Sequence, residues 1–358
     1  MINVTKPFLP PKEVFLRYVD EIWNRVRLTN NGPLVNELER RLKEYLGLNH
    51  LLFVSSGTMA LQMSIKALAL KGEIITTPYS FVATTSSIVW EGCKPVFVDI
   101  NEYDLNINPK LIESVITSRT VAILATHIYG NPSAIDQILM IAKKYKLEVI
   151  FDAAHCFGTK YKGQSVMNFG DISTVSFNAT KIFSTVEGGA IVTNNPSLQK
   201  KLALIRNFGR TSPHSIEGVG INGKNSEFHA AMGLSIIGYM DEVLKRRKEQ
   251  YLYYQKMLKN LNVSFLRLNP DGEFNYSYLP IIFQSEEELE NAIKALNKQH
   301  VFPRRYFYPS LNTLGFTDRY SCPISEDISR RVLTLPLHHD LTFESIDMIC
   351  EILLKESK

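Results

Sequence analysis

The sequence predicts an α/β protein in which a large domain with a mainly parallel sheet precedes a smaller α+β domain. Up to about residue 230, short apolar runs alternate strictly with helical patterns, which is typical of a parallel sheet with helices on both faces. From about Asn262, strand-like runs are separated by turn residues, and a charged helix follows. A chain of 358 residues can bury cores of this size. We expect the division to separate residues 1–245 from residues 246–358.

The N-terminal part is expected to form helices over residues 13–26 and from Val35 onward, where apolar residues recur at helical spacing. The next unit, LLFVSSGTMALQMSIKALAL, joins a strand to a helix through the turn SSGT. Small residues at such a turn leave the first N–H groups of the helix available to an anion. Gly57 and Thr58 are therefore candidate phosphate-binding residues, although an ordinary capped turn has the same pattern.

The following segment, EIITTPYSFVATTSSIVWEGCKPVFVDI, repeats the order of strand, loop, helix and strand. Phe81 lies in its loop, where an aromatic ring can stack on a flat ligand. A core phenylalanine at the start of a helix is the alternative. A helix over residues 108–118, a strand in VAILATHIYGN and a helix over residues 135–145 come next. His127 ends that strand, and a buried, hydrogen-bonded histidine is the simpler interpretation of it.

Two apolar strands then end in reactive side chains. The first, in LEVIFDAAH, ends at Asp152, and the second, ISTVSF, is followed four residues later by Lys181. An acid and a lysine at neighbouring strand ends are what a pyridoxal phosphate enzyme requires. The lysine amine binds the aldehyde of that cofactor covalently, and the acid keeps its pyridine nitrogen protonated. An acid that caps a helix and a lysine on the surface are the alternatives.

The motifs FDAAH and SFNATKxFxTxEGGAIVT resemble the DegT/StrS family of nucleotide-sugar aminotransferases. The resemblance implies a fold-type I, aspartate aminotransferase-like structure with a seven-stranded type of sheet. It also implies that Lys181 is the catalytic residue, that Asp152 binds the ring nitrogen, and that His155 binds the phenolic oxygen of the cofactor. Ser176 is expected to bind its phosphate, and the PYSF segment strengthens the stacking role of Phe81. Dehydratase relatives carry His in place of the lysine, so the sequence favours amino transfer.

Three further segments resemble family motifs. In GINGKNSEFHAAMG the resemblance implies that Asn222 reaches the phosphate of a partner subunit, and Lys224 replaces the usual arginine beside it. The segment LTNNGP makes Asn30 a candidate near the active site. The segment RRYFYP is similar to that of enzymes making 4-amino-4,6-dideoxy sugars, and an exposed edge strand is the alternative. Its candidate residues for contacts with the nucleotide or the donor carboxylate are Arg304, Arg305, Tyr306 and Tyr308.

The remaining C-terminal elements are read from pattern alone. A long helix is expected over residues 230–260, with a possible break near Gly238. Strands are expected in VSFLRL, YSYLPIIF and VFPRRYFYP, a helix in SEEELENAIKALNKQ, and another helix at the C-terminus.

Composition excludes several classes of function. The formal charge of +4 is too small for a nucleic-acid binder. Apolar runs are shorter than the roughly 18 residues of a membrane helix, and no secretory signal is recognised at the start. The four cysteines, at positions 93, 156, 322 and 350, form no CxxC pair, so we expect free thiols, no metal site and a cytoplasmic location.

The function expected is transfer of an amino group from L-glutamate to C4 of dTDP-4-keto-6-deoxyglucose, giving dTDP-4-amino-4,6-dideoxyglucose for a surface polysaccharide such as O-antigen. The enzyme would be a homodimer with shared active sites, using pyridoxal phosphate and pyridoxamine phosphate. The alternatives are a 3-aminotransferase acting on a dTDP-3-keto-6-deoxyhexose, and a regulator that binds the cofactor without turnover.

Overall fold

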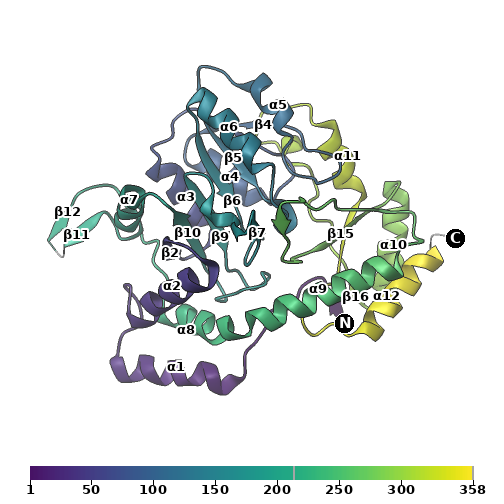
Figure 1. The fold of residues 1–358 in the computed structure, drawn as a ribbon, viewed down its shortest axis with the longest axis horizontal. Coiled ribbons are helices and arrows are strands. Elements are labelled where there is room, and N and C mark those ends of the chain that lie inside the picture. The colour runs from purple at the N-terminus through teal and green to yellow at the C-terminus, as the bar shows by residue number, and fades with distance from the viewer. Residues whose placement is uncertain (213, 357–358) are drawn as a thin grey trace.

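The computed structural model describes residues 1–212 and 214–356 and confirms the α/β prediction. Within these residues the main sheet has seven strands in the order β2-β10-β9-β6-β5-β3-β4, and β10 alone runs antiparallel to its neighbours. The mainly parallel character is therefore confirmed (Figure 1). The bounds are β2 His50–Val54, β3 Glu73–Thr76, β4 Lys94–Phe97, β5 Thr120–Thr126, β6 Glu148–Asp152, β9 Ile172–Ser176 and β10 Gly189–Thr193.

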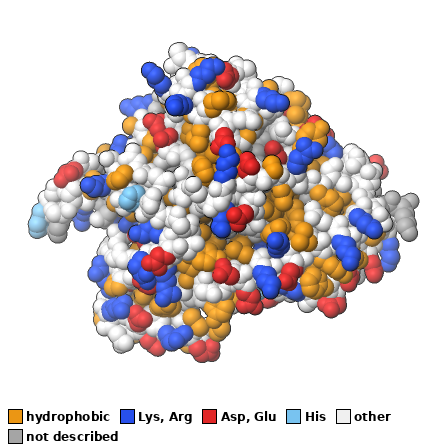
Figure 2. Space-filling model, in the orientation of Figure 1, with side chains coloured by type: hydrophobic (Ala, Val, Ile, Leu, Met, Phe, Trp, Pro, Cys, Tyr) orange, Lys and Arg blue, Asp and Glu red, His pale blue; other side chains and the backbone are white. Residues whose placement is uncertain are grey.

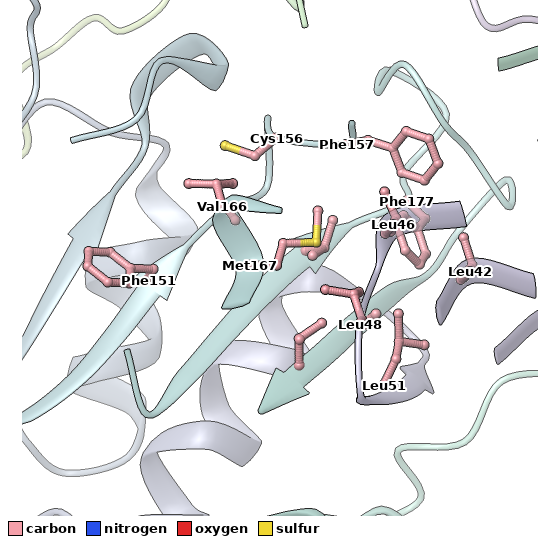
Figure 3. Close-up of a cluster of buried hydrophobic side chains, with 14 of the residues drawn as sticks. Leu42, Leu46, Leu48, Leu51, Phe151, Cys156, Phe157, Val166, Met167 and Phe177 are labelled. Carbon is pink, nitrogen blue, oxygen red and sulfur yellow. The ribbon is translucent and has the colours of Figure 1, made fainter. Parts of the chain in front are cut away.

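Helices cover both faces of this sheet because successive strand residues point to opposite sides. In β6, Phe151 joins the core beneath one set of helices and Ile150 joins the core beneath the other. Figure 3 shows part of the first of these cores, which contains Phe151 of β6, Leu42 and Leu46 of α2, and Cys156 and Phe157 of the loop after β6. The helices of that face are α2 Pro33–Leu46, α6 Ile135–Tyr145 and α8 Glu227–Ile236; those of the other are α3 Gly57–Ala67, α4 Val82–Trp90 and α7 Pro196–Arg206.

The strands that were expected to carry the acid and the lysine are direct neighbours. β6 and β9 pair in parallel, with Asp152 opposite Thr174. Their carboxyl ends therefore lie at the same edge of the sheet, which is where α/β proteins bind ligands. β10 then returns antiparallel along β9, with Gly189 opposite Ser176.

The N-terminal helices depend on a residue far away in the sequence. α1 spans Lys12–Arg25, and α2 begins at Pro33, two residues before the expected start. The buried Glu227 carboxylate of α8 accepts the backbone N–H groups of Leu34 and Val35, at 3.0 Å each. These amides have no acceptor within their own helix, so the negative charge caps the start of α2.

The helical prediction over residues 108–118 was too long. The helix α5 covers Pro109–Ile112 and continues only as a 3-10 turn over Glu113–Val115. Smaller elements complete this half of the chain: strands β7 Lys160–Tyr161, β8 Gln164–Ser165, β11 Arg210–Ser212 and β12 Ser215–Ile216, with 3-10 turns over Ile128–Gly130 and Val166–Asn168. β11 and β12 form a hairpin that projects from the body of the molecule in Figure 1.

The C-terminal part has its own core around a three-stranded antiparallel sheet, β13-β15-β17. The expected long helix is interrupted by a 3-10 turn over Ile237–Tyr239, so the break near Gly238 is confirmed. The boundary after residue 245 falls inside α9 and stays a prediction. The bounds here are α9 Met240–Met257, β13 Ser264–Phe265, β14 Gly272–Glu273, β15 Leu279–Ile282, α10 Glu286–Lys298, α11 Pro323–Arg331, β17 Val332–Leu335 and α12 Phe343–Glu356, with a 3-10 turn over Leu311–Thr313.

The strand expected in VFPRRYFYP was mostly wrong. Only Val301–Phe302 forms a strand, β16, which pairs in parallel with β1 at Ile2–Asn3. Pro303 and Pro309 lack the N–H group that a strand ladder requires, so the segment between them leaves the sheet. It touches β17 again only through an isolated bridge between Arg304 and Thr334.

Charged side chains of both signs are interspersed on the face shown in Figure 2, rather than gathered into a basic stripe. Among the described residues, no helix is long and apolar enough to cross a membrane.

The stability of the fold is expected to fall in mildly acidic solution because of His127. Its ring is fully buried against Phe151 and accepts the N–H of Ser133 at Nδ1, and burial lowers its pKa from 6.5 to about 3. Between these two pH values only the unfolded chain takes up the proton. The contribution of neutral His127 to the free energy of unfolding is therefore fully present above pH 6.5 and is lost as the pH falls toward 3. The loss amounts to about 2 kcal/mol at pH 5.

Unfolding of the cofactor-free protein at pH 7 and pH 5 measures this effect. His127→Gln should lose less free energy of unfolding between the two pH values than the wild type. The exposed His300→Gln is the control and should retain the wild-type difference. An unchanged difference in His127→Gln would contradict the assignment.

Candidate active site

A cavity of about 360 Å³ lies at the sheet edge where β6 and β9 end. The structure brings eight of the predicted site residues to its walls. They come from the turn before α3, the start of α4, the segments after β6 and β9, and the C-terminal part: Gly57, Thr58, Phe81, Asp152, His155, Ser176, Lys181 and Tyr306.

Asp152 is the buried carboxylate of the cavity, with 5% of its surface exposed. Its Oδ2 accepts the hydroxyl of Thr84 at 2.7 Å, and its Oδ1 accepts the N–H of Ala154 at 3.1 Å. Burial raises the pKa of this carboxyl above 3.8, while the two hydrogen bonds and the charge of Lys181 oppose the rise. A cationic partner in the cavity would favour the ionised form further.

A chain of buried hydroxyls supports the Asp152 carboxylate from behind. Thr84 donates its proton to Asp152, so its oxygen accepts the hydroxyl of Ser80 at 2.8 Å. Ser80 in turn lies 3.1 Å from the hydroxyl of Thr126. Sequence reasoning missed these residues, because isolated serines and threonines in a strand and a helix carry no distinctive signal.

His155 is buried, and the proton position on its ring follows from one contact. The backbone N–H of Tyr129 donates to Nδ1 at 3.2 Å, so Nδ1 is an acceptor and Nε2 carries the proton. Burial lowers the pKa of His155 well below 6.5, and the charge of Lys181 acts in the same direction. The ring is therefore neutral near pH 7 and offers one N–H donor.

The turn before α3 forms a cradle for an anion. Ser56 caps the helix by accepting the N–H of Met59, at 3.0 Å, which leaves the first amides, those of Gly57 and Thr58, without a helical acceptor. A Cβ atom on Gly57 would lie 2.9 Å from the Cβ of Ser176, and one on Gly189 would lie 2.5–2.6 Å from the backbone of the turn. Glycine at both positions lets β10 and β9 approach the turn closely.

Lys181 and Phe81 both line the cavity. The Nζ atom of Lys181 is 3.5 Å from the hydroxyl of Tyr278, and its backbone N–H is bonded to the carbonyl of Asn178. Phe81 precedes α4 and keeps 58% of its surface exposed. A large aromatic ring that stays open at a cavity wall is suited to stacking on a ligand.

Two predicted residues lie next to the hairpin β11–β12 instead of at the cavity wall. Asn222 is exposed and forms a bridge with Asn207. Lys224 is 9% exposed, and its Nζ binds the side chain of Asn207 at 3.0 Å and lies 4.5 Å from the centre of the Phe208 ring. Burial, together with two nearby arginines, lowers the pKa of Lys224.

Four predicted substrate residues also lie outside the cavity lining. Asn30 is exposed, and its carbonyl accepts Arg27. Arg304 is exposed, whereas the guanidinium of Arg305 binds Glu286 at 2.6 Å and stacks 3.9 Å from the centre of the Tyr308 ring. Their roles stay predictions.

The cavity wall from the C-terminal part holds two residues that sequence reasoning missed. Tyr278 and Phe307 join Tyr306 there. Tyr278 directly precedes β15, in a segment read only as a strand, and Phe307 was passed over between two named tyrosines. The aromatic density of these two segments was the available signal.

Comparison with known proteins identifies the chemistry of this site. A model of the DegT/DnrJ/EryC1/StrS aminotransferase family matches residues 11–354. The chain belongs to that family. It is therefore an aminotransferase, and its cofactor is pyridoxal phosphate.

Individual relatives extend over the whole length. The chain is 42% identical to a dTDP-4-amino-4,6-dideoxy-D-glucose transaminase of Shigella dysenteriae, over 97% of each chain. It is 36% identical to an Escherichia coli transaminase of the same description, over 99% of this chain and 98% of that one. The solved structure of DesI in the presence of its TDP-sugar product matches with a TM-score of 0.94 at 29% identity, covering 100% of this chain and 93% of that one.

The residues at the cavity fit this cofactor. Among the described residues, each oxygen of the buried Asp152 carboxylate accepts one hydrogen bond and so retains an acceptor site for a protonated ring nitrogen. The neutral His155 offers an N–H donor, and the amides of Gly57 and Thr58 open a helix N-terminus to a phosphate. Lys181 lines the same cavity and carries an amine that could bind the aldehyde of the cofactor.

Replacing Gly189 with alanine is expected to weaken cofactor binding. The added Cβ must displace the turn at Ser56 and Gly57, and overpacking of this kind costs about 1–3 kcal/mol. Binding should therefore weaken about ten- to hundredfold if the cost falls on the bound form. Titration of the apoenzyme, followed by cofactor absorbance, measures the dissociation constant. The control Gly238→Ala adds a methyl group in open space and should bind as the wild type does; equal affinity in Gly189→Ala would contradict the role of the cradle.

Proposed function

We propose that this aminotransferase acts at C4 of a nucleotide-linked 4-keto-6-deoxy sugar and converts dTDP-4-keto-6-deoxyglucose to dTDP-4-amino-4,6-dideoxyglucose. The observation that carries the proposal is the 42% identity, over 97% of both chains, to a transaminase described by that product. The E. coli relative and DesI, solved with its TDP-sugar product, support the same nucleotide-sugar class. L-Glutamate is the proposed amino donor.

In the proposed reaction, Lys181 is the catalytic residue and moves a proton in both half-reactions. When bound, the cofactor supplies an electron sink for the carbon that loses the proton. The amine of Lys181 takes the proton from the donor carbon and returns it at the cofactor's side, and the sequence is reversed on the sugar. Its position at the cavity wall supports this role.

Other residues of the cavity hold the reacting groups in place in this proposal. Asp152 pairs with the protonated ring nitrogen, and the N–H of His155 binds the phenolic oxygen. Phe81 stacks on the ring and excludes water from one face. Ser176 joins the amides of Gly57 and Thr58 at the phosphate. The burial of Asp152 and the hydrogen bond that fixes the ring of His155 support these assignments.

The proposed enzyme is a homodimer in which Asn222 enters the phosphate site of the other chain and Lys224 lies beside it. The projecting hairpin β11–β12 supports this arrangement (Figure 1). Apolar side chains on and next to this hairpin are exposed in the single chain, as expected of a surface that another protein covers. They are Phe208, Ile216, Val219 and Ile221.

The sugar nucleotide is proposed to enter beside the segment 304–308. Tyr306 lies at the cavity, and Arg304, Arg305 and Tyr308 continue from it toward the outside. Asn30 is proposed to contact the substrate near the active site. A cytoplasmic location and a use in surface polysaccharide such as O-antigen complete the proposal.

The discriminating experiment supplies purified enzyme with dTDP-4-keto-6-deoxyglucose and L-glutamate and locates the new nitrogen by NMR. Nitrogen at C4 is expected. In a parallel reaction the enzyme is given the 3-keto isomer; turnover of that isomer alone, with nitrogen at C3, would favour the 3-aminotransferase alternative. Glutamate alone should bleach the visible band of the bound cofactor. Lys181→Ala should lower turnover by at least about 10³-fold, since it removes the proton carrier. Turnover of this variant at the wild-type rate, or no bleaching of the wild type, would contradict the proposal.

Hybrid dimers test the shared site. Lys181→Ala and Asn222→Ala homodimers should both be impaired at limiting cofactor. If Asn222 serves the other chain, the hybrid of these two chains has one site with both residues intact. Co-expression with two affinity tags isolates the hybrid, and its activity should approach half of the wild-type activity. A hybrid no more active than the Asn222→Ala homodimer would place Asn222 at its own chain's site or at none.

A further inference from the structure

Within the described part of the chain, Tyr278 is the residue whose side chain forms a hydrogen bond with the Lys181 amine. Its hydroxyl lies 3.5 Å from Nζ, at the long end of the hydrogen-bond range, and its ring centre lies 5.9 Å away. Catalytic hydrogen bonds in cofactor-free structures are often long and shorten only when the site is loaded. The contact joins two distant parts of the chain, because Lys181 follows β9 and Tyr278 directly precedes β15.

The Tyr278 ring cannot move freely. It is 5% exposed and meets the His155 ring at 5.0 Å and 72°, and the Tyr306 ring at 5.7 Å and 89°. These edge-to-face contacts are the favourable geometry for aromatic pairs. The hydroxyl is therefore presented to Lys181 at a fixed position.

The backbone before Tyr278 is held from two sides. The carbonyl of His155 accepts the side chains of Asn275, at 2.7 Å, and Ser277, at 2.6 Å. From the other side, the buried guanidinium of Arg247 in α9 binds the carbonyls of Tyr276 and Ser277. These bonds tie the segment to the loop that carries His155 and so set the distance from Tyr278 to the site.

We propose that Tyr278 is a positioning residue for Lys181. Its hydroxyl holds the amine whenever the amine is not bound to the cofactor, and so keeps Nζ where the proton is taken and returned. The inference rests on the proposed role of Lys181 as proton carrier. Tyr278 itself gains or loses no proton in the reaction, and its ring serves the aromatic packing separately from its hydroxyl.

Tyr278→Phe tests this separation, because it keeps the ring and removes only the hydroxyl. Tyr276→Phe is the matched control: the same change two residues earlier, on a ring that packs against Tyr251 and Phe274. Both variants should unfold at the wild-type temperature. A lower unfolding temperature in Tyr278→Phe alone would indicate a structural role and overturn the proposal.

The first readout needs no cofactor. The apoenzyme is treated with trinitrobenzenesulfonate, and the labelling rate of Lys181 is followed by peptide mass spectrometry. Removing one hydrogen bond should free the amine and raise its labelling rate about three- to tenfold in Tyr278→Phe. The exposed Lys162 gives the internal standard. Unchanged labelling of Lys181 would overturn the proposal.

The second readout is the bleaching of the loaded enzyme by glutamate in a single turnover. Tyr278→Phe should bleach about three- to tenfold more slowly at saturating glutamate, with the half-saturating concentration within about twofold of the wild type. The deuterium effect of α-deuterated glutamate should not fall. If the wild type bleaches and Tyr278→Phe bleaches at the same rate, the inference about Tyr278 is overturned and the proposed function is not. Absence of bleaching in the wild type would instead contradict the proposed function, and the labelling experiment would still decide the contact.

Discussion

The burial of the Asp152 carboxylate is the constraint on which the rest of the site depends. Burial disfavours its ionised form, yet the role proposed for Asp152, as partner of a protonated ring nitrogen, requires a carboxylate. Two hydrogen-bond donors, the hydroxyl of Thr84 and the amide of Ala154, and the charge of Lys181 offset this effect of burial. Thr84 lies in α4, Ala154 follows β6 and Lys181 follows β9, so the pairing of β6 with β9 brings two of these three groups together at the carboxylate.

The C-terminal elements are fastened to the same edge rather than simply packed near it. The carbonyl of His155 accepts two side-chain donors from the segment before β15, and Asp99, at the end of the strand region of β4, accepts the amides of Ile324 and Ser325 at the start of α11. At each of these two places, His155 and Asp99, a residue of a loop at the sheet edge accepts hydrogen bonds from the C-terminal part. The wall that faces the cofactor residues is therefore fixed by polar contacts at two points, and its aromatic side chains fill the space between.

The sequence predicted the features that local patterns determine, and it did not predict those that depend on contacts between residues far apart in the chain. The alternation of strands and helices, the pairing of Asp152 with the strand before Lys181, and the break at Gly238 were all readable from period and motif. The strand in VFPRRYFYP failed because two prolines outweigh the β-forming residues between them. The hydrogen bonds from Ser80 to Thr126, from Thr84 to Asp152 and from Lys181 to Tyr278 join residues 46 to 97 positions apart in the chain, and no single segment carries a signal for them.

The two walls of the cavity differ in how they are built, and this difference matches the proposed division between the chemistry and the choice of substrate. The wall of Asp152, Ser176 and Lys181 belongs to strand ends whose register the sheet fixes. The opposite wall depends on the carbonyl of Tyr306, which accepts the hydroxyl of the buried Tyr129. The buried Tyr79 in turn donates its hydroxyl to the Tyr129 oxygen at 2.7 Å. A change in the segment 304–308 can therefore alter the space offered to a sugar while the strand ends stay in place. Family membership identifies the amino transfer, and the motifs that carry it lie on the first wall; the choice of sugar is the role proposed for the segment 304–308.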